Sequence, residues 1–188
     1  MIPVLHFDEV NEEILYSKDP VTKVDKGDID FLKGRSIANK RRRIRLCVHP
    51  GVDDSLHEML IVHHAGNYVP PHRHPGKSES FHMIEGALKI VLFDADGAIF
   101  DIIDLDASGA AGFFYYRLSE SLYHTVIPVS DVVVFHETTN GPFRREDMLI
   151  PEWAPEDGDE ETVIQEYMTR LNKEIDGWYA VRRQNNDE

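Results

Sequence analysis

The sequence has little cysteine, few basic residues for its acidic content and no long apolar segment. Its one cysteine, Cys47, cannot form a disulfide within the chain, and we expect it to be a small buried residue in a reducing cytosol. Lysine and arginine number 20 against 34 aspartates and glutamates, and the net charge of −14 repels nucleic acid and anionic membranes. No apolar run is long enough to span a bilayer, and no secretory signal is visible. We therefore expect a cytoplasmic protein with no nucleic acid and no membrane as partner.

A length of 188 residues is enough to bury a core in one domain with short additions. We divide the chain into an N-terminal extension (1–36), a central unit (37–143) and an acidic C-terminal segment (144–188). Three helices are expected outside the central unit, and we expect the last ten residues to be frayed. The expected helices are Asn11 to Tyr16, Asp28 to Lys33 and Asp159 to Ile175.

The central unit shows the period-two pattern of β-strands. Ile44, Leu46 and Val48 alternate with Arg43 and Arg45, which is typical of a strand with one buried face. Short apolar runs separated by turn residues follow at close spacing, and this favours an antiparallel sandwich or barrel. These further strands are predicted at Leu60 to His64, Phe81 to Ile84, Leu88 to Phe93, Ile99 to Ile103, Phe113 to Arg117, Tyr123 to Ile127 and Val132 to His136.

A set of metal-ligand residues lies within this unit. His72 and His74 are two residues apart, so on an extended chain both imidazoles leave the same face. Glu79 has the other parity, so the chain must turn between them, and Pro75-Gly76 supplies that turn. Imidazole and carboxylate together suit a first-row transition metal. We predict a metal site here, to which a later strand brings His124.

The basic run from Lys40 to Arg45 has two interpretations. It is either a solvated or intersubunit face paired with acids, or the source of one arginine, Arg43, that binds an anionic group at the mouth of the barrel. His82 has the opposite parity to Glu79, and we expect it at a sheet–sheet or subunit contact.

Other charged and aromatic residues lie near the predicted ligands in the sequence. Lys77 sits on the turn and is a candidate for substrate binding, as is Arg117. Glu120 is the candidate for a proton-handling carboxylate, and Tyr123 is the second catalytic candidate.

Several short motifs carry a resemblance to a known family. They are Arg41-Arg42-Arg43, Gly66 to His74, Lys77-Ser78-Glu79 closed by Gly86, Phe93 to Gly97, His124-Thr125, Gly141-Pro142-Phe143 and Trp153-Ala154-Pro155-Glu156. The spacing of the glycines, histidines and glutamate resembles the first signature of the cupin superfamily, and the set as a whole resembles the WbuC-type cupin metalloproteins over residues 36–157. The second cupin signature is altered here, with Leu118-Ser119-Glu120 in place of Pro-x-Gly and Pro128 in place of asparagine.

The resemblance implies a fold, a ligand set and a functional context. The fold is all-β, a jelly-roll-like antiparallel cupin barrel with short helical additions at both ends. The ligands are His72, His74, Glu79 and His124, holding one divalent ion of zinc, iron, manganese or nickel. The family occurs in bacterial gene sets for surface polysaccharide, which favours a sugar or sugar-nucleotide isomerase or epimerase.

Two other functions stay open on the sequence. One is an Fe(II)-dependent dioxygenase, and the other is a metal-dependent module that binds or senses a small molecule without turnover. In each case we expect an anionic or sugar-derived small-molecule ligand and a homodimer, because a small barrel has sheet edges to cover.

Overall fold

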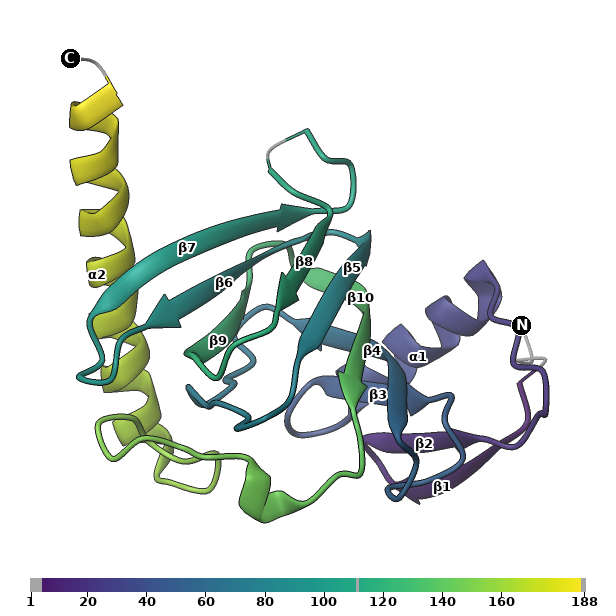
Figure 1. Ribbon diagram of the computed structural model, residues 1–188. Coiled ribbons are helices and arrows are strands. Elements are labelled where there is room, and N and C mark those ends of the chain that lie inside the picture. The colour runs from purple at the N-terminus through teal and green to yellow at the C-terminus, as the bar shows by residue number, and fades with distance from the viewer. Residues whose placement is uncertain (1–4, 111, 187–188) are drawn as a thin grey trace.

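The protein is an all-β fold of two facing sheets with one helix on each outer side (Figure 1). The computed structural model describes residues 5–110 and 112–186. The larger sheet has the strand order β1-β2-β3-β4-β10-β5-β8 and the smaller one β7-β6-β9. The strands are β1 Phe7–Asn11, β2 Ile14–Ser17, β3 Arg43–Cys47, β4 Leu56–His64, β5 Glu79–Glu85, β6 Ala87–Phe93, β7 Ile99–Asp106, β8 Tyr115–Leu118, β9 Tyr123–Pro128 and β10 Val132–Asn140. The helices are α1 Lys26–Ala38, α2 Glu161–Asn186 and a short 3₁₀ turn at Arg145–Asp147.

The inner faces of the two sheets meet in the main core. Met59, Phe81 and Phe135 of the larger sheet pack with Ile90 and Val126 of the smaller one. The alternation of side chains along each strand sends the neighbouring residues to the outer faces. The space between the sheets is therefore apolar at its centre, and only inward-facing residues near its rim can build a polar site.

Each helix covers part of one outer face. Ile29 and Leu32 of α1 pack on Ile44 and Val62 of the larger sheet. α1 begins at a capping box in which the Asp28 amide donates to the Asp25 carboxylate at 3.0 Å and the Asp25 amide to that of Asp28 at 3.0 Å. The predicted helix near Asp28 is confirmed.

On the opposite side of the molecule, the apolar stripe of α2 covers the smaller sheet (Figure 1). Ile164, Tyr167 and Leu171 pack on Val91 and Ile102. The predicted helix at residues 159–175 is confirmed, but the prediction of a frayed end is wrong for most of the segment, because α2 continues to Asn186. No helix in the described ranges combines the length and apolar character needed to span a membrane.

The N-terminal residues form strands where a helix was predicted. Residues 7–11 and 14–17 make a hairpin whose second strand, β2, pairs with β3 in parallel. The helix prediction for Asn11 to Tyr16 is therefore wrong. The pairing of Leu15 with Leu46 makes this segment a strand, and such a tertiary contact cannot be predicted from the local sequence pattern. β2 and β3 are also the one parallel pair among the named strands, whereas only antiparallel pairing was expected.

The strands predicted for the central unit are confirmed as β3 to β10. Ile44 and Leu46 face α1, while Cys47 on the other side of β3 joins the core between the sheets. Cys47 is buried and free, as predicted. The two facing sheets and flanking helices confirm the expected all-β fold with helical additions toward both ends.

Candidate metal centre

The histidines and the glutamate of the predicted site come from both sheets and from the segment between β4 and β5. His124 lies on β9 of the smaller sheet and Glu79 begins β5 of the larger one. His72 lies on the segment between β4 and β5. Its amide donates to the His124 carbonyl at 3.0 Å, and the His124 amide donates to the His72 carbonyl at 2.9 Å. This pair of hydrogen bonds holds the two residues directly opposite one another, so their side chains leave on the same side.

A turn returns Glu79 to the histidines, as the sequence predicts. Gly76 has φ +72°, a left-handed conformation that a side chain at this position disfavours. β5 then opens at Glu79 and closes before Gly86, where φ is +76° and a Cβ would lie 2.5 Å from the Val132 carbonyl oxygen. The spacing of the motif therefore follows from the backbone: one glycine makes the turn and the other lets two chains approach closely.

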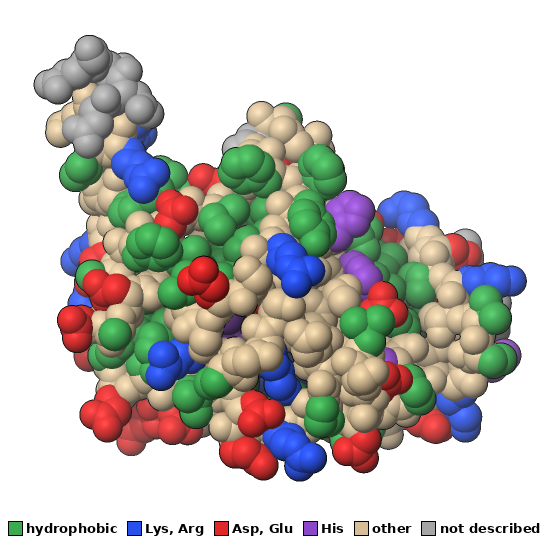
Figure 2. Space-filling model, in the orientation of Figure 1, with side chains coloured by type: hydrophobic (Ala, Val, Ile, Leu, Met, Phe, Trp, Pro, Cys, Tyr) green, Lys and Arg blue, Asp and Glu red, His purple; other side chains and the backbone are tan. Residues whose placement is uncertain are grey.

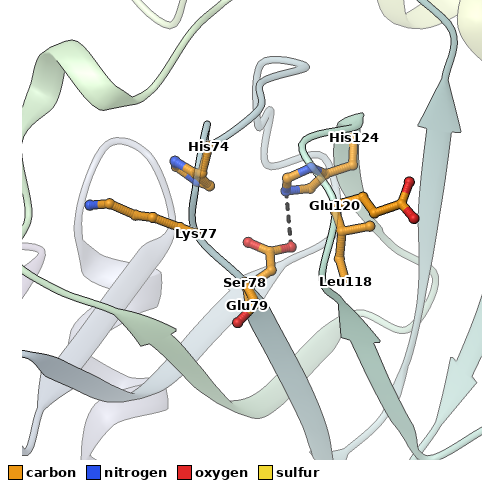
Figure 3. A pocket seen from close by; sticks show the side chains of 7 residues that line it. All are labelled: His74, Lys77, Ser78, Glu79, Leu118, Glu120 and His124. Atoms are coloured by element: carbon orange, nitrogen blue, oxygen red, sulfur yellow. Dashed lines mark ion pairs between the residues drawn. The ribbon is translucent and has the colours of Figure 1, made fainter.

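The four side chains converge on one point. One ligand atom from each of His72, His74, Glu79 and His124 lies within 4.8 Å of the others. The Glu79 Oε1 atom is 3.0 Å from the His124 Nε2 atom, and the two rings of His72 and His124 have centroids 4.4 Å apart. Figure 3 shows His74 and His124 on either side of the Glu79 carboxylate.

Backbone carbonyls fix the orientation of two rings. The Nδ1 atom of His72 is 2.9 Å from the Pro70 carbonyl oxygen, and the Nδ1 atom of His124 is 3.0 Å from that of Leu122. An Nδ1–H that donates to a carbonyl leaves Nε2 as the free lone pair. Both rings are thus held in the tautomer that offers Nε2 to a cation.

Burial and the single carboxylate set the proton affinity of the site. Burial lowers the pKa of His72 to about 3 and also lowers the pKa of His74. For His124 burial acts in the same direction, but the Glu79 carboxylate outweighs it and raises the pKa. Burial alone raises the pKa of Glu79, yet the surrounding histidines reverse this and lower it. Glu79 and His124 therefore each favour the charged form of the other.

The residues present fit a divalent transition metal. Oε1 of Glu79 and Nε2 of His124 are both buried, and neither has a partner in hydrogen-bond geometry among the described residues, although they are 3.0 Å apart. Two lone-pair-bearing atoms that lie this close without a hydrogen bond between them are directed at a common third point. Three imidazoles and one carboxylate are donors for such an ion, and they leave coordination positions for a further ligand.

A small pocket lies beside these atoms. Its volume is about 10 Å³, room for about one water molecule. It is lined by His74, Lys77, Ser78, Glu79, Leu118, Glu120 and His124. In Figure 3 the Lys77 ammonium and the Glu120 carboxylate point away from the Glu79 carboxylate. Lys77 donates instead to the Pro142 carbonyl at 2.6 Å and lies 3.4 Å from Asp147.

The other residues proposed from the sequence lie outside this pocket. Arg43 is paired with Glu13 at 2.9 Å and Asp157 at 2.8 Å at the rim of the larger sheet. Arg117 alternates with the inward residues of β8 and is exposed on the outer face. Tyr123 precedes His124 on β9, so its ring faces the opposite layer, where it packs against Trp153 at 5.8 Å.

Arg45, Tyr116 and Glu137 lie near the site and are not among the candidates predicted from the sequence. Glu137 on β10 and Tyr116 on β8 flank Phe81 of β5, two residues inward from Glu79. The Tyr116 hydroxyl and the Arg45 Nε atom are buried without a hydrogen-bond partner in the described part of the chain. Burial, with Glu79 nearby, raises the pKa of Glu137 to about 8 despite the opposing charge of Arg45.

A lone carboxylate in an apolar strand was the available signal for Glu137. Glu137 lies beside β5 because β10 pairs with both β4 and β5, and this pairing cannot be predicted from the local sequence. Tyr116 lies two residues before Leu118 and shares its buried face of β8, so strand parity was the available signal for it.

Comparison with known protein families and solved structures finds similarity over about half of the chain. Residues 24–105 match a family described as a domain of unknown function (DUF6016). Comparison with curated proteins gives no match. Among solved structures, oxalate decarboxylase from Bacillus subtilis at pH 4.6 aligns with a TM-score of 0.41 and 19% identity, over 53% of this chain and 24% of that one.

Two further structures align over a similar part of the chain. Protein SO0799 from Shewanella oneidensis gives a TM-score of 0.45 with 13% identity, over 54% of this chain and 65% of that one. The cupin domain of Schizosaccharomyces pombe Cnp3 gives 0.41 with 11% identity, over 53% and 64%. The chain thus spans less than two thirds of each of these three structures.

Proposed function

We propose that this chain is a metal-binding cupin that holds one divalent transition metal ion through His72, His74, Glu79 and His124. The observation that carries the proposal is the convergence of these four donors, two of whose buried atoms have no hydrogen-bond partner in the described residues. The bound ion would polarise an oxygen of a small ligand or acidify a bound water. Zinc, iron, manganese and nickel all suit the ligand set.

The protein residues would contribute orientation and proton transfer. The carbonyls of Pro70 and Leu122 hold two imidazoles in the tautomer that the metal needs. Glu120 lines the mouth of the pocket and is the proposed carboxylate for proton transfer, since a rotation of its side chain changes which way it points. Glu137 is a second carboxylate on the inner side, whose raised pKa places a proton within the barrel near neutral pH.

As the activity, we propose metal-dependent isomerisation or epimerisation of a sugar or sugar nucleotide in surface polysaccharide metabolism. Support comes from the motifs that resemble the WbuC-type cupins and from ionisable groups on both sides of an open metal position. An Fe(II)-dependent dioxygenase uses the same ligand types and differs in the ion that it holds. Metal identity therefore separates the two activities.

A second candidate function is a metal-dependent binding module without turnover. The size of the pocket favours this function. A volume of about 10 Å³ accepts one water or one atom of a small molecule beside the metal-binding residues, and not a whole sugar ring. Such a module would bind a small anion through one or two oxygen atoms on the metal. A cytoplasmic location suits either function.

Elemental analysis tests the proposal. Protein purified without a metal-chelating tag should hold close to one equivalent of a transition metal, and His74→Ala and Glu79→Ala should lose it. His82→Ala is the matched control, because His82 lies on β5 with its side chain on the outer face. Iron would favour oxidative chemistry, and zinc, manganese or nickel would favour isomerase chemistry. A wild-type protein that holds no metal, even after reconstitution, would overturn the proposal.

A further inference from the structure

A long segment joins β10 to α2 and passes beside the residues that carry the first two histidine ligands. We call residues 142–149 of this segment the strap. None of residues 143–149, all of which the structure describes, is buried. Figure 1 shows the segment along the lower edge of the molecule, and Figure 2 shows charged side chains of both signs at that edge. The strap is therefore held in place by specific polar contacts more than by apolar burial.

The strap pairs with the chain next to His74. The Arg73 amide donates to the Leu149 carbonyl at 3.0 Å, and the Leu149 amide donates to the Arg73 carbonyl at 3.0 Å. The His74 ring also reaches the strap. Burial lowers the pKa of His74, and a hydrogen bond from the ring to the Asp147 backbone opposes this effect. An imidazole N–H that donates to the Asp147 carbonyl leaves the other ring nitrogen for a metal ion.

His74 differs in this respect from the other two histidine ligands. His72 and His124 are each oriented by the carbonyl of the residue two positions earlier in the chain. The carbonyl that orients His74 belongs to the strap, which is distant in the sequence. The orientation of this one imidazole therefore depends on how the strap is folded.

Lys77 fastens the strap at two points. Its Nζ atom donates to the Pro142 carbonyl at 2.6 Å and lies 3.4 Å from the Asp147 Oδ2 atom. The Lys77 side chain is 13% exposed, so both contacts are largely shielded from water and are stronger than the same contacts on an open surface. The two polar groups of Asp147 thus have separate partners: Lys77 holds its carboxylate, and His74 binds its backbone.

We propose that Lys77 and Asp147 are positioning residues for the metal centre: Lys77 holds Asp147 in the strap, and Asp147 holds the His74 imidazole toward the ion. This inference rests on the proposed metal site and gives its third imidazole a support outside the four ligands. It also gives Lys77 a role other than substrate binding, since its ammonium already has a carbonyl and a carboxylate as partners. An effect of the strap on metal affinity must be matched by an equal effect of the metal on the strap.

Competition between each protein and a chelator for Co²⁺ tests the proposal. Lys77→Met and Asp147→Ala should each weaken Co²⁺ binding about tenfold, which is the low end of the effect of a group that supports a metal ligand. The double variant should be no weaker than either single one, because the two residues act through one contact. Lys77→Arg should bind nearly as wild type does, since a guanidinium also donates to a carbonyl and pairs with a carboxylate. The visible absorption of bound Co²⁺, which reports its ligands, should change in the two single variants and not in Lys77→Arg.

The sign of the two effects separates positioning from a simple effect of charge. Loss of a positive charge near the site should by itself strengthen cation binding, and loss of a negative charge should weaken it. A positioning role predicts that both variants weaken binding. Lys89→Met is the matched control and should leave Co²⁺ binding unchanged, because Lys89 is also partly buried and donates to Asp104 at 2.7 Å, but on the smaller sheet. Opposite effects of Lys77→Met and Asp147→Ala, no effect of either, or fully additive losses in the double variant would overturn the proposal.

Limited digestion with trypsin tests the strap in the absence of metal. Arg144 and Arg145 are exposed within the strap, so the rate of cleavage after them reports how often the strap opens. Metal-free Lys77→Met and Asp147→Ala should be cleaved there several times faster than wild type, with circular dichroism as the check on folding. Equal rates would overturn the role of Lys77 in fastening the strap. A wild type that binds no Co²⁺ would overturn the proposed function and this proposal with it, whereas a wild type and variants that bind Co²⁺ equally well would overturn this proposal alone.

Discussion

Glu79 Oε1 lies 3.0 Å from His124 Nε2, yet the two buried atoms form no hydrogen bond with one another or with another described residue. They come from different sheets, and their approach joins the two sheets across the barrel. A buried carboxylate beside three imidazoles is costly to leave without a cation. We therefore expect metal binding at this site to be coupled to the stability of the fold.

Metal removal should lower the thermal stability of the protein. A ligand present at 100 times its Kd stabilises the folded state by about 2.7 kcal/mol. For a chain of this size that corresponds to about 5–10 °C in Tm. Differential scanning calorimetry with and without a chelator measures the shift. The variant Glu79→Gln should show no chelator effect, and an equal effect in both proteins would contradict the coupling.

Metal affinity should weaken as the pH falls. Despite burial, Glu79 raises the pKa of His124 above its ordinary 6.5, so the metal-free site holds a proton that the ion must displace. Affinity should be constant above that pKa and fall about tenfold per pH unit below it. His72, with a pKa of about 3, stays neutral throughout and adds no slope.

Competition between the protein and a chelator for Zn²⁺, measured from pH 8.5 to 5.5, tests this dependence. The control variant His82→Ala should give the same curve as wild type, because its side chain lies on the outer face. An affinity that is flat over the whole range would show that no proton is displaced on binding.

Local pattern was sufficient to predict the strands of the barrel and the ligands that share a short segment. The alternation from Arg43 onward and the turn at Gly76 both follow from neighbours in the chain. His124 was predicted on a later strand, in agreement with the family resemblance, and in the structure it is aligned by backbone pairing with His72, 52 residues earlier. Tyr123 and His124 are adjacent on one strand, so their side chains face opposite layers. Strand alternation alone therefore predicts that Tyr123 points away from the site.

Pairing between distant strands was not predictable from local pattern. β2 is a strand because Leu15 pairs with Leu46 of β3, although a helix was predicted for residues 11–16. Glu137 approaches Glu79 only because β10 is inserted between β4 and β5. Arg43 is held by Asp157, which is 114 residues away. In each case tertiary contacts decide the position of the residue, and a window of ten or fifteen residues does not contain them.

Replacing Glu137 by glutamine should stabilise the metal-free protein near neutral pH. Burial and Glu79 raise the pKa of Glu137 from 4.5 to about 8 in the folded state. Between those values the unfolded chain has released a proton that the folded chain keeps, so the stability falls as the pH rises. Glu137→Gln removes this loss and should gain about 1–3 kcal/mol at pH 7.5, with little difference at pH 4.

Urea unfolding of chelator-treated protein at the two pH values measures the effect of Glu137→Gln. Glu58→Gln is the matched control, because Glu58 lies on the neighbouring strand β4 with a side chain that is 43% exposed. It should change the stability by less than about 0.5 kcal/mol at either pH. A variant of Glu137 that is less stable than wild type at pH 7.5 would show that the carboxylate is ionised and well paired in the fold.

The glycine that closes the ligand motif should be required for its backbone alone. At Gly86 φ is +76° and a Cβ would lie 2.5 Å from the Val132 carbonyl oxygen, so Gly86→Ala must distort the turn between β5 and β6. We expect a loss of about 1–3 kcal/mol in the free energy of unfolding. Gly51→Ala is the control, since a Cβ there meets nothing within 4 Å and its φ is not in the left-handed region. Urea unfolding of both variants decides the question: equal stabilities would mean that Gly86 is not required by the backbone, and that its place in the motif has another cause.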